Sequence, residues 1–205
     1  MNKIVNRAKS HFENQKRRYL FLISIIAIGI ISGILFILFI SKTDKLLVRS
    51  ELENVFETIN NHKLNYFNTF LNSMLSSILS MLGIYVLGIS LIGMPLIILF
   101  LYIKGFVFGF SVSGIISIYH LKGIPIVFAY LFPSHFILLI IWILLGFHAI
   151  NFSINLFRYL FLKENIPLNR YFKKLNKVLI LSFIIMIICT ILETFLSPFL
   201  IDLCL

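Results

Sequence analysis

Residues 71–110 read LNSMLSSILSMLGIYVLGISLIGMPLIILFLYIKGFVFGF, and the only charged side chain in this stretch is Lys104. The stretch is the middle of a longer block, from Lys63 to Arg158, whose interior has two charges, Lys104 and Lys122, and no acid. A bilayer has a hydrocarbon core about 30 Å thick and needs about 20 apolar residues for each helical crossing. The block therefore predicts three membrane crossings, or four if they are packed tightly.

The composition of the whole chain agrees with a membrane protein. It is 60% hydrophobic and 13% charged, with a mean hydropathy of +1.00, whereas soluble proteins are about a quarter charged. Further apolar runs span residues 19–40 and 178–200. Strands of a membrane barrel would alternate apolar and polar residues, but residues 22–40 are almost continuously apolar, so helices are the predicted spanning structure. The expected fold class is all-α, a polytopic integral membrane protein.

The net charge of +10 does not indicate nucleic-acid binding, because the cations lie in two short segments beside apolar runs. The expected partner of the surface is the lipid bilayer. The first apolar run is longer than the 7–15 residues of a signal-peptide core, so we expect it to remain as an anchor. Cys189 and Cys204 would lie about 22 Å apart on one helix, too far for a disulfide, and are expected to be inert thiols.

Charge predicts the topology. Residues 1–18 contain six Lys or Arg and one acid, and residues 158–177 contain six and one. Such segments face the cytoplasm. The central block must then cross three times, which gives five transmembrane helices, a cytoplasmic N-terminus and an extracytoplasmic C-terminus. The predicted parts are a basic cytoplasmic tail, 1–18, and a five-helix membrane domain, 19–205, with an extracytoplasmic loop, 42–70, and the basic cytoplasmic loop 158–177.

The spans are predicted near residues 19–41, 71–92, 95–119, 124–157 and 178–203. Gly93 and Pro95 mark a tight joint between the second and third spans, because glycine and proline end and start helices. The fourth segment is too long for one straight crossing. Pro133 either kinks it, or divides it into a short re-entrant piece, residues 123–132, and a true span from Ser134.

The loop 42–70 has four cations and four acids. Within it, apolar residues recur at helical spacing, at Val48, Leu52, Val55, Phe56 and Ile59. They predict a short amphipathic helix with an acidic opposite face. Its apolar side either rests on the outer leaflet or forms a docking face for an extracytoplasmic partner.

Small residues form stripes on two predicted spans. Gly29 and Gly33 are four residues apart in the first span, and the third span repeats this interval at Gly105, Gly109, Ser113 and Ser117. Small residues let helix backbones approach closely in lipid. The stripes serve either packing inside one chain or a homodimer.

Lys104 and Glu193 are the two opposite charges expected deep in the membrane. A charge there costs about 2.5–3.5 kcal/mol on insertion scales, so it usually faces the bundle interior and has a partner or a function. An ion pair between these two residues is the main structural hypothesis. In the alternative, Lys104 extends to the cytoplasmic surface and Glu193 is protonated or lies near the outer interface. Glu193 could also satisfy backbone groups freed by Pro198.

No constellation for catalysis is present in the sequence. It has no HExxH pair of metal ligands, and the Gly-x-Ser triplets at residues 88–90 and 109–111 are expected in a membrane chain rich in both residues. His135 is expected to form hydrogen bonds at a helix start. We therefore expect no enzyme activity, metal or cofactor. A small transporter or channel is the alternative function, because helices broken at Pro95 and Pro133 and an intramembrane Lys/Glu pair are typical of midplane binding sites.

Three segments of the chain resemble one known family. Leu87-Gly-Ile-Ser-Leu-Ile-Gly-Met-Pro-Leu96, which continues to Ile103-Lys-Gly-Phe-Val-Phe-Gly-Phe110, is similar to the central signature of the stage II sporulation protein M family. Phe132-Pro-Ser-His-Phe136 lies where the family starts its fourth span, and Glu193-Thr-Phe-Leu-Ser-Pro-Phe-Leu-Ile201 resembles its C-terminal pattern. With the basic tail and five spans, the resemblance covers essentially the whole chain.

The resemblance implies a protein of the mother-cell membrane at the sporulation septum. It implies a non-catalytic membrane scaffold that acts with stage II sporulation proteins D and P in peptidoglycan remodelling during engulfment. For single residues it implies structural importance only, at Gly88, Gly93, Pro95, Lys104, Gly105, Gly109, Pro133, Glu193 and Pro198.

Overall fold

The computed structural model describes residues 2–60, 65–131 and 134–204, with side chains for 16–59, 65–131 and 134–201. Within these residues every regular element is helical. The α-helices are α1 Asn2–Phe39, α2 Lys42–Asn60, α3 Tyr66–Ile89, α4 Gly93–Tyr119, α5 Gly123–Leu131, α6 His135–Phe161, α7 Leu168–Ile191 and α8 Ser197–Cys204. A 3₁₀ turn, η1, covers His120–Lys122, and a π-helical turn, η2, covers Leu192–Leu196.

The structure confirms the all-α class and the predicted number of spans. In the described residues, five helical segments are long and apolar enough to cross a membrane. They are Lys16–Phe39, Tyr66–Ile89, Gly93–Leu131, His135–Phe161 and Leu168–Ile201.

The helices extend beyond the predicted spans, because hydropathy marks the bilayer and not the ends of a helix. The basic tail is continuous with the first span in α1 rather than a separate segment. The basic loop 158–177 is also largely helical, since α6 ends at Phe161 and α7 starts at Leu168, directly after Pro167. Proline favours this position because its missing N–H is not needed at a helix start.

The predicted single span 124–157 is wrong, and the alternative of two pieces is confirmed. α5 is a separate helix that ends at Leu131, and α6 begins at His135. Pro133 lies outside the described residues. His120, whose φ of 51° is unusual for a residue with a side chain, ends α4 and lets the chain turn into α5.

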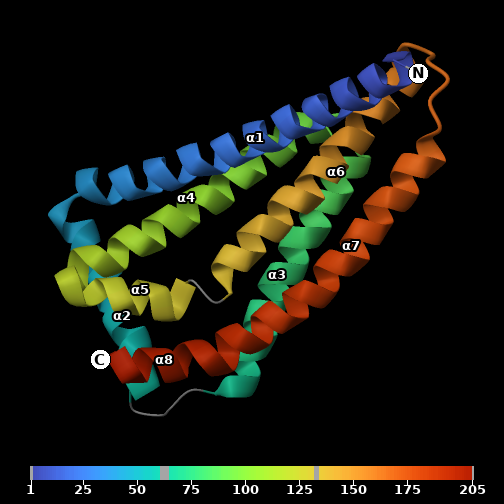
Figure 1. The fold of residues 1–205 in the computed structure, drawn as a ribbon. Coiled ribbons are helices and arrows are strands. Elements are labelled where there is room, and N and C mark those ends of the chain that lie inside the picture. Colours follow the sequence, from blue (N-terminus) through green and yellow to red (C-terminus); the bar gives the residue numbers. More distant parts are fainter. Residues whose placement is uncertain (1, 61–64, 132–133, 205) are drawn as a thin grey trace.

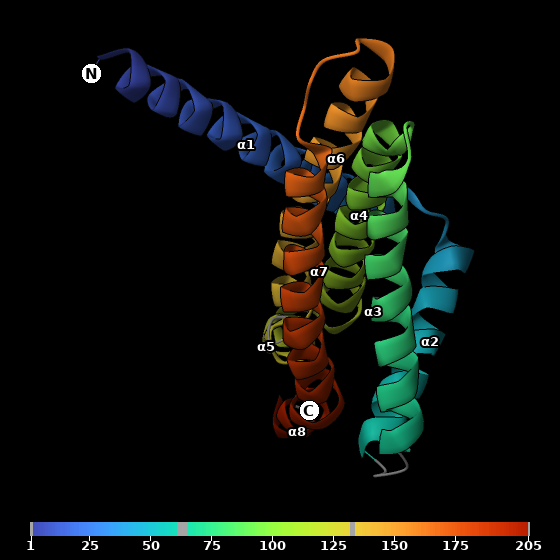
Figure 2. The ribbon, with the colours of Figure 1, turned by 90° about the vertical axis from the view of Figure 1, so that its right-hand side faces the viewer.

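The spans form one bundle whose core is buried between α1, α3, α4, α6 and α7. α1 and α4 lie side by side and run in the same direction, and α3, α6 and α7 pack beside them (Figure 1). At one end of the bundle α2, α5 and α8 gather around a second apolar cluster, which includes Phe56, Ile115 and Ile201. We call this group the cap. Figure 2, from the side, shows the N-terminal part of α1 extending away from the other helices.

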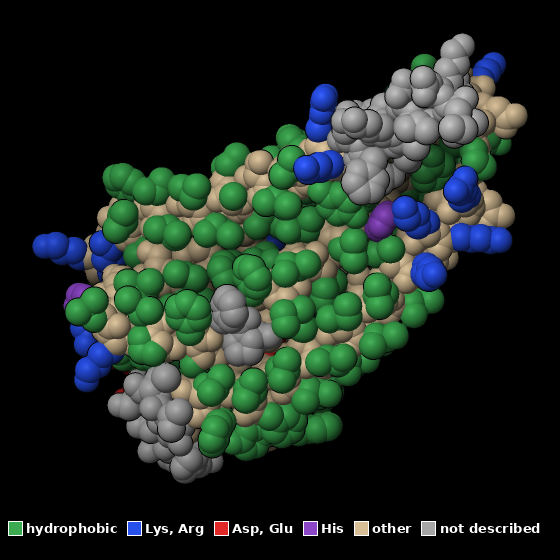
Figure 3. All heavy atoms as spheres, in the orientation of Figure 1, with side chains coloured by type: hydrophobic (Ala, Val, Ile, Leu, Met, Phe, Trp, Pro, Cys, Tyr) green, Lys and Arg blue, Asp and Glu red, His purple; other side chains and the backbone are tan. Residues whose placement is uncertain are grey.

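The surface has the character expected for a protein in lipid. Hydrophobic side chains cover the middle of the face seen in Figure 3, whereas Lys and Arg gather at its two ends. Large apolar side chains on the spans are exposed, such as Leu38 on α1, Val86 on α3 and Ile180 on α7, each at 63%. Lipid chains would cover this exposed apolar belt.

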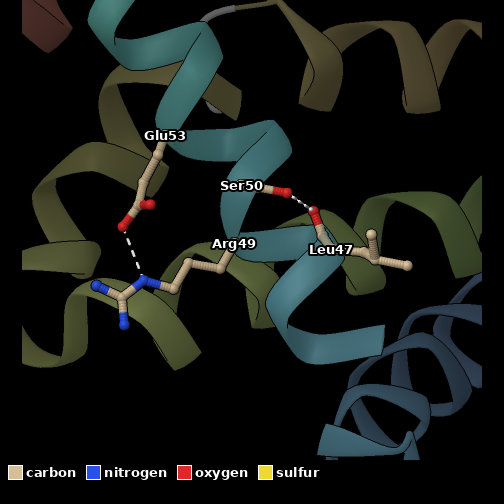
Figure 4. Close-up of polar contacts among 4 residues, drawn as sticks. All are labelled: Leu47, Arg49, Ser50 and Glu53. Atoms are coloured by element: carbon tan, nitrogen blue, oxygen red, sulfur yellow. Dashed lines mark hydrogen bonds and ion pairs between the residues drawn. The ribbon is translucent and has the colours of Figure 1, made fainter. Parts of the chain in front are cut away.

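The amphipathic helix α2 packs against the protein itself. Phe56 and Ile59 are 3% and 6% exposed and join the cap cluster, while Val55 remains 44% exposed. The buried part of the apolar face is therefore covered by the chain, not by lipid or a partner. On its outer side Arg49 Nε donates to Glu53 Oε1 at 2.7 Å, and this hydrogen bond raises the pKa of Arg49 (Figure 4).

Candidate functional site

The glycine stripes join α1 to α4 backbone against backbone. A Cβ on Gly105 would lie 2.5 Å from the carbonyl oxygen of Ile26, and one on Gly109 would overlap that of Ile30. Gly29 and Gly33 approach the backbone of α4 in the same way, at Tyr102 and Phe106. These stripes therefore serve packing inside one chain. We call the contact of Gly29 and Gly33 with Gly105 and Gly109 the glycine seam. It fixes the rotation of α4 about its axis.

Gly88, Gly93 and Pro95 shape the hairpin between α3 and α4. A Cβ on Gly88 would lie 2.6 Å from that of Ala149 on α6, and one on Gly93 would overlap the carbonyl oxygen of Leu87. Pro95 lies in the first turn of α4, where its missing N–H costs no intrahelical bond. These residues therefore set the close packing at the joint between α3 and α4.

With α4 fixed in this rotation, Lys104 points into the bundle. Its Nζ donates to Ser80 Oγ of α3 at 2.7 Å and lies 4.6 Å from the ring centre of Trp142 on α6. The predicted extension of Lys104 to the membrane surface is therefore wrong. A hydroxyl and an aromatic face replace part of its hydration, while Ser80 donates onward to the carbonyl of Ser76.

Glu193 approaches the same region from η2. Pro198 has no N–H to donate to Thr194 and would clash with its carbonyl group in a regular helix. The helix widens by one residue instead, and the N–H of Ser197 donates to the carbonyl of Leu192. Glu193 lies in this turn and accepts a hydrogen bond from Ser73 Oγ at 2.9 Å. Such π-helical turns occur often at functional sites.

Lys104 and Glu193 line one polar cavity of about 390 Å³. The walls come from α3, α4, α5, α6 and η2, and α3 contributes four polar side chains. The polar lining consists of Asn72, Ser73, Ser76, Ser77, Lys104, Ser111, Tyr130, His135, Trp142 and Glu193. A cavity of this size and polarity can hold water or a small polar ligand.

The predicted ion pair between Lys104 and Glu193 is not formed. Among the described residues the one salt bridge is Arg49–Glu53. Lys104 is bonded to Ser80 and Glu193 to Ser73. The two serines are seven residues apart on α3, which is about 10 Å along a helix. The two charges therefore face one cavity at different depths, each with its own hydroxyl partner.

His135 also lines the cavity, at the start of α6. Its Nδ1 lies 3.2 Å from Ser134 Oγ, and its ring packs 5.7 Å from that of Tyr130, measured between centres. This agrees with the expected hydrogen bonding at a helix start. In the described residues, no cluster of three or more His, Cys, Asp or Glu side chains could hold a metal ion.

Sequence reasoning missed the serines of α3 and the roles of Tyr130 and Trp142. A signal for the serines was present, because Ser73, Ser76, Ser77 and Ser80 follow the i, i+3, i+4, i+7 pattern of one helix face. In a membrane span such a polar stripe is an unfavourable surface for lipid. It therefore indicates a polar interior, as the cavity shows.

A family model described as stage II sporulation protein M matches residues 20–198. The chain belongs to this family. No match was found among curated proteins or among solved structures. The matched range contains all five spans in whole or in large part. It also contains both charges of the cavity and the glycines of the seam. As a member of the stage II sporulation protein M family, the chain is a sporulation-related membrane protein.

Proposed function

We propose that this protein is a non-catalytic membrane scaffold that recruits or regulates peptidoglycan hydrolases at the septum during engulfment in endospore formation. Membership of the stage II sporulation protein M family supports the process and the membrane location. The observation that carries the scaffold role is the cap, in which α2 packs on α8 and on the end of α4. Such a platform presents a defined surface to a partner.

The proposed orientation places the cap outside the cell. The end opposite the cap carries the cations of residues 16–18 and 158–177, and basic segments remain in the cytoplasm. The cap then faces the cell wall. On this basis we propose stage II sporulation proteins D and P as the partners and the mother-cell membrane at the septum as the location.

The outer face of α2 offers both apolar and acidic groups to such a partner. Leu46 and Leu47 are 63% and 64% exposed, and Glu51 and Glu57 are exposed further along the helix. Because Phe56 fixes the inner face, these side chains are held in place. Binding to a preformed surface avoids the entropy cost of ordering it.

A photoreactive amino acid at exposed Asn54 tests the platform. The full-length chain, carrying this residue, would replace the family member of an endospore-forming bacterium. We expect crosslinks to wall hydrolases of the D and P kinds after engulfment begins. The matched control places the same amino acid at exposed Lys163, at the opposite end. Equal crosslinking from both sites, or none from Asn54 in cells that complete engulfment, would contradict the proposal.

Cysteine labelling in intact cells tests the orientation. In a chain whose two natural cysteines are replaced by Ser, Glu57→Cys should react with an impermeant thiol reagent and Asn169→Cys should be shielded. Both positions are exposed on the protein, so the difference reports the side of the membrane. The reverse pattern would place the cap in the cytoplasm.

The polar cavity favours a second candidate function, a small transporter or channel. Lys104, Glu193 and the serines of α3 provide charged and hydroxyl groups at membrane depth, as in midplane binding sites. Glu193→Gln separates the two functions. A scaffold should keep its Asn54 crosslinks in this variant. Ion or solute flux in proteoliposomes that disappears in Glu193→Gln, with unchanged crosslinking, would favour transport.

A further inference from the structure

A second polar cavity lies at the basic end of the bundle, away from the site described above. Its volume is about 620 Å³, and it is enclosed by the beginning of the first span, the last turns of α6 and the first turns of α7. Four cations line it, Arg18, Arg158, Arg170 and Lys174, and no acid lines it among the side chains that the structure describes. This arrangement concentrates positive charge in a concave site, which attracts an anion.

Neutral hydrogen-bonding groups complete the lining. Asn155 and Tyr171 offer an amide and a phenol. Arg18 donates through its guanidinium to Asn151 Oδ1, which ties the first span to α6 at the wall of the cavity. Arginine presents several N–H donors in a fixed plane and is well suited to phosphate oxygens. The lining therefore matches an oxyanion, such as a phosphate group.

An apolar cavity of about 270 Å³ adjoins the basic one. The two share Arg18, Phe147 and Asn151 as lining residues. The remaining walls of the apolar cavity include Phe21, Leu22, Met94, Ile98, Ile150 and Ile154. A free phosphate or another soluble anion would leave this apolar space without an occupant.

The pair of cavities also lies at the right depth for a lipid. Arg18 directly precedes the apolar run 19–40, and Lys174 lies just before the apolar run 178–200. The cations are thus at the level of the headgroups. The apolar cavity, lined by residues of α1, α4 and α6, is at the level of the part of the acyl chains next to the headgroups. Basic sites between spans bind anionic lipids in this way.

We propose that this composite site binds one anionic phospholipid, with the phosphodiester among Arg18, Arg158, Arg170 and Lys174 and one acyl chain along Phe21, Ile98 and Ile154. The lipid would join α1, α6 and α7 at the basic end of the bundle. The site requires neither the polar cavity nor the scaffold function. It also exists in either orientation of the chain.

The test uses the full-length protein, purified in a neutral detergent and stripped of lipid. Native mass spectrometry measures binding of phosphatidylglycerol, of phosphatidylcholine with the same chains, and of inorganic phosphate. We expect phosphatidylglycerol to bind about tenfold more tightly than phosphatidylcholine, since each nearby cation strengthens binding to anionic lipid. Equal binding of the two lipids would overturn the proposal. Inorganic phosphate that displaces phosphatidylglycerol completely at comparable concentration would show a free-anion site and would also overturn it.

Two double variants with the same charge change locate the site. Arg158→Gln with Lys174→Gln removes two cavity cations and should weaken phosphatidylglycerol binding about tenfold or more. Lys163→Gln with Lys173→Gln removes two exposed cations of the same end that do not line the cavity, and should change binding less than about twofold. Equal losses in both would mean attraction by the basic end as a whole and would reject the site. If a variant fails to fold, the comparison of phosphatidylglycerol with phosphatidylcholine on the unchanged protein still tests the proposal.

Discussion

The two sides of α4 make opposite kinds of contact in the same membrane. Toward α1, Gly105 and Gly109 bring the helix into direct contact with another backbone, and no space remains for a side chain. Toward α3 and α6, Lys104 and Ser111 face a polar cavity. The glycine seam determines which side of α4 faces the cavity. A helix held this closely on one face cannot rotate to move Lys104 toward lipid.

The largest expected effect comes from breaking the seam. A Cβ on Gly109 overlaps the carbonyl oxygen of Ile30, so Gly109→Ala must push α1 and α4 apart. Overpacking typically costs about 1–3 kcal/mol, and a clash with backbone lies at the upper end of this range or beyond it. We expect a strong fall in thermal stability in detergent and in the amount of protein in the membrane.

Gly83→Ala is the matched control for this change. Among the described residues of other elements, the atom nearest to a Cβ at Gly83, on α3, is a carbon of the Phe100 ring at 3.9 Å. The substitution should therefore be neutral or stabilise the helix by up to about 1 kcal/mol. Gly88→Ala should fall between the two, because its Cβ would lie 2.6 Å from the Cβ and 3.0 Å from the Cα of Ala149, a smaller overlap than the one at Gly109. Equal stability of all three variants would show that the seam does not depend on close contact.

The seam was predictable from the sequence and the contact between the two charges was not, for a physical reason. A four-residue repeat of small residues indicates backbone contact whichever helix is opposite, so Gly29, Gly33, Gly105 and Gly109 could be assigned before the partner was known. Whether two charges meet depends on the relative rotation and depth of three helices. Spacing along the chain does not fix these, and the expected contact between Lys104 and Glu193 was wrong.

The number of spans also followed from the sequence, through charge balance, whereas the break between α5 and α6 was one of two alternatives that the Pro133 segment left open. The packing of α2 did not. An amphipathic pattern shows that an apolar face exists, but not which surface covers it. The pattern included Val55 with Phe56 and Ile59, and only the last two are buried. The elements that cover α2, namely α8 and the end of α4, lie far along the chain.

On the cavity side, removing the Ser80 hydroxyl is expected to lower stability, whereas removing the Lys104 charge is not. Ser80→Ala removes the hydroxyl that solvates Lys104, and an unsatisfied buried polar group costs about 1–3 kcal/mol. Lys104→Met removes the charge itself and leaves Ser80 bonded to Ser76, so this variant should keep or raise stability, since replacing buried charge by apolar groups is often stabilising. Thermal unfolding of purified protein measures both.

The double variant sharpens this prediction. Lys104→Met should rescue Ser80→Ala, so that the double variant is about as stable as Lys104→Met alone, which is a coupling of about 1–3 kcal/mol. Lys122→Met, at the end of the bundle in η1, is the control and should not rescue Ser80→Ala. If Lys104→Met destabilises the protein more than Ser80→Ala does, the lysine makes contacts that matter more to folding than its desolvation.

The smallest expected effect is the coupling between Lys104 and Glu193. Breaking a buried contact pair typically costs about 3–5 kcal/mol. Here the partners of the two charges are about 10 Å apart along α3, a separation at which two unit charges interact by less than about 2 kcal/mol at an effective dielectric constant of 20. Serine hydroxyls and water in the cavity screen the charges further. A double-mutant cycle of Lys104→Met and Glu193→Gln should therefore give a coupling of about 1 kcal/mol or less, below that of Lys104 with Ser80. A coupling near 3 kcal/mol would mean that the two charges meet directly in the membrane, and that the cavity closes around them there.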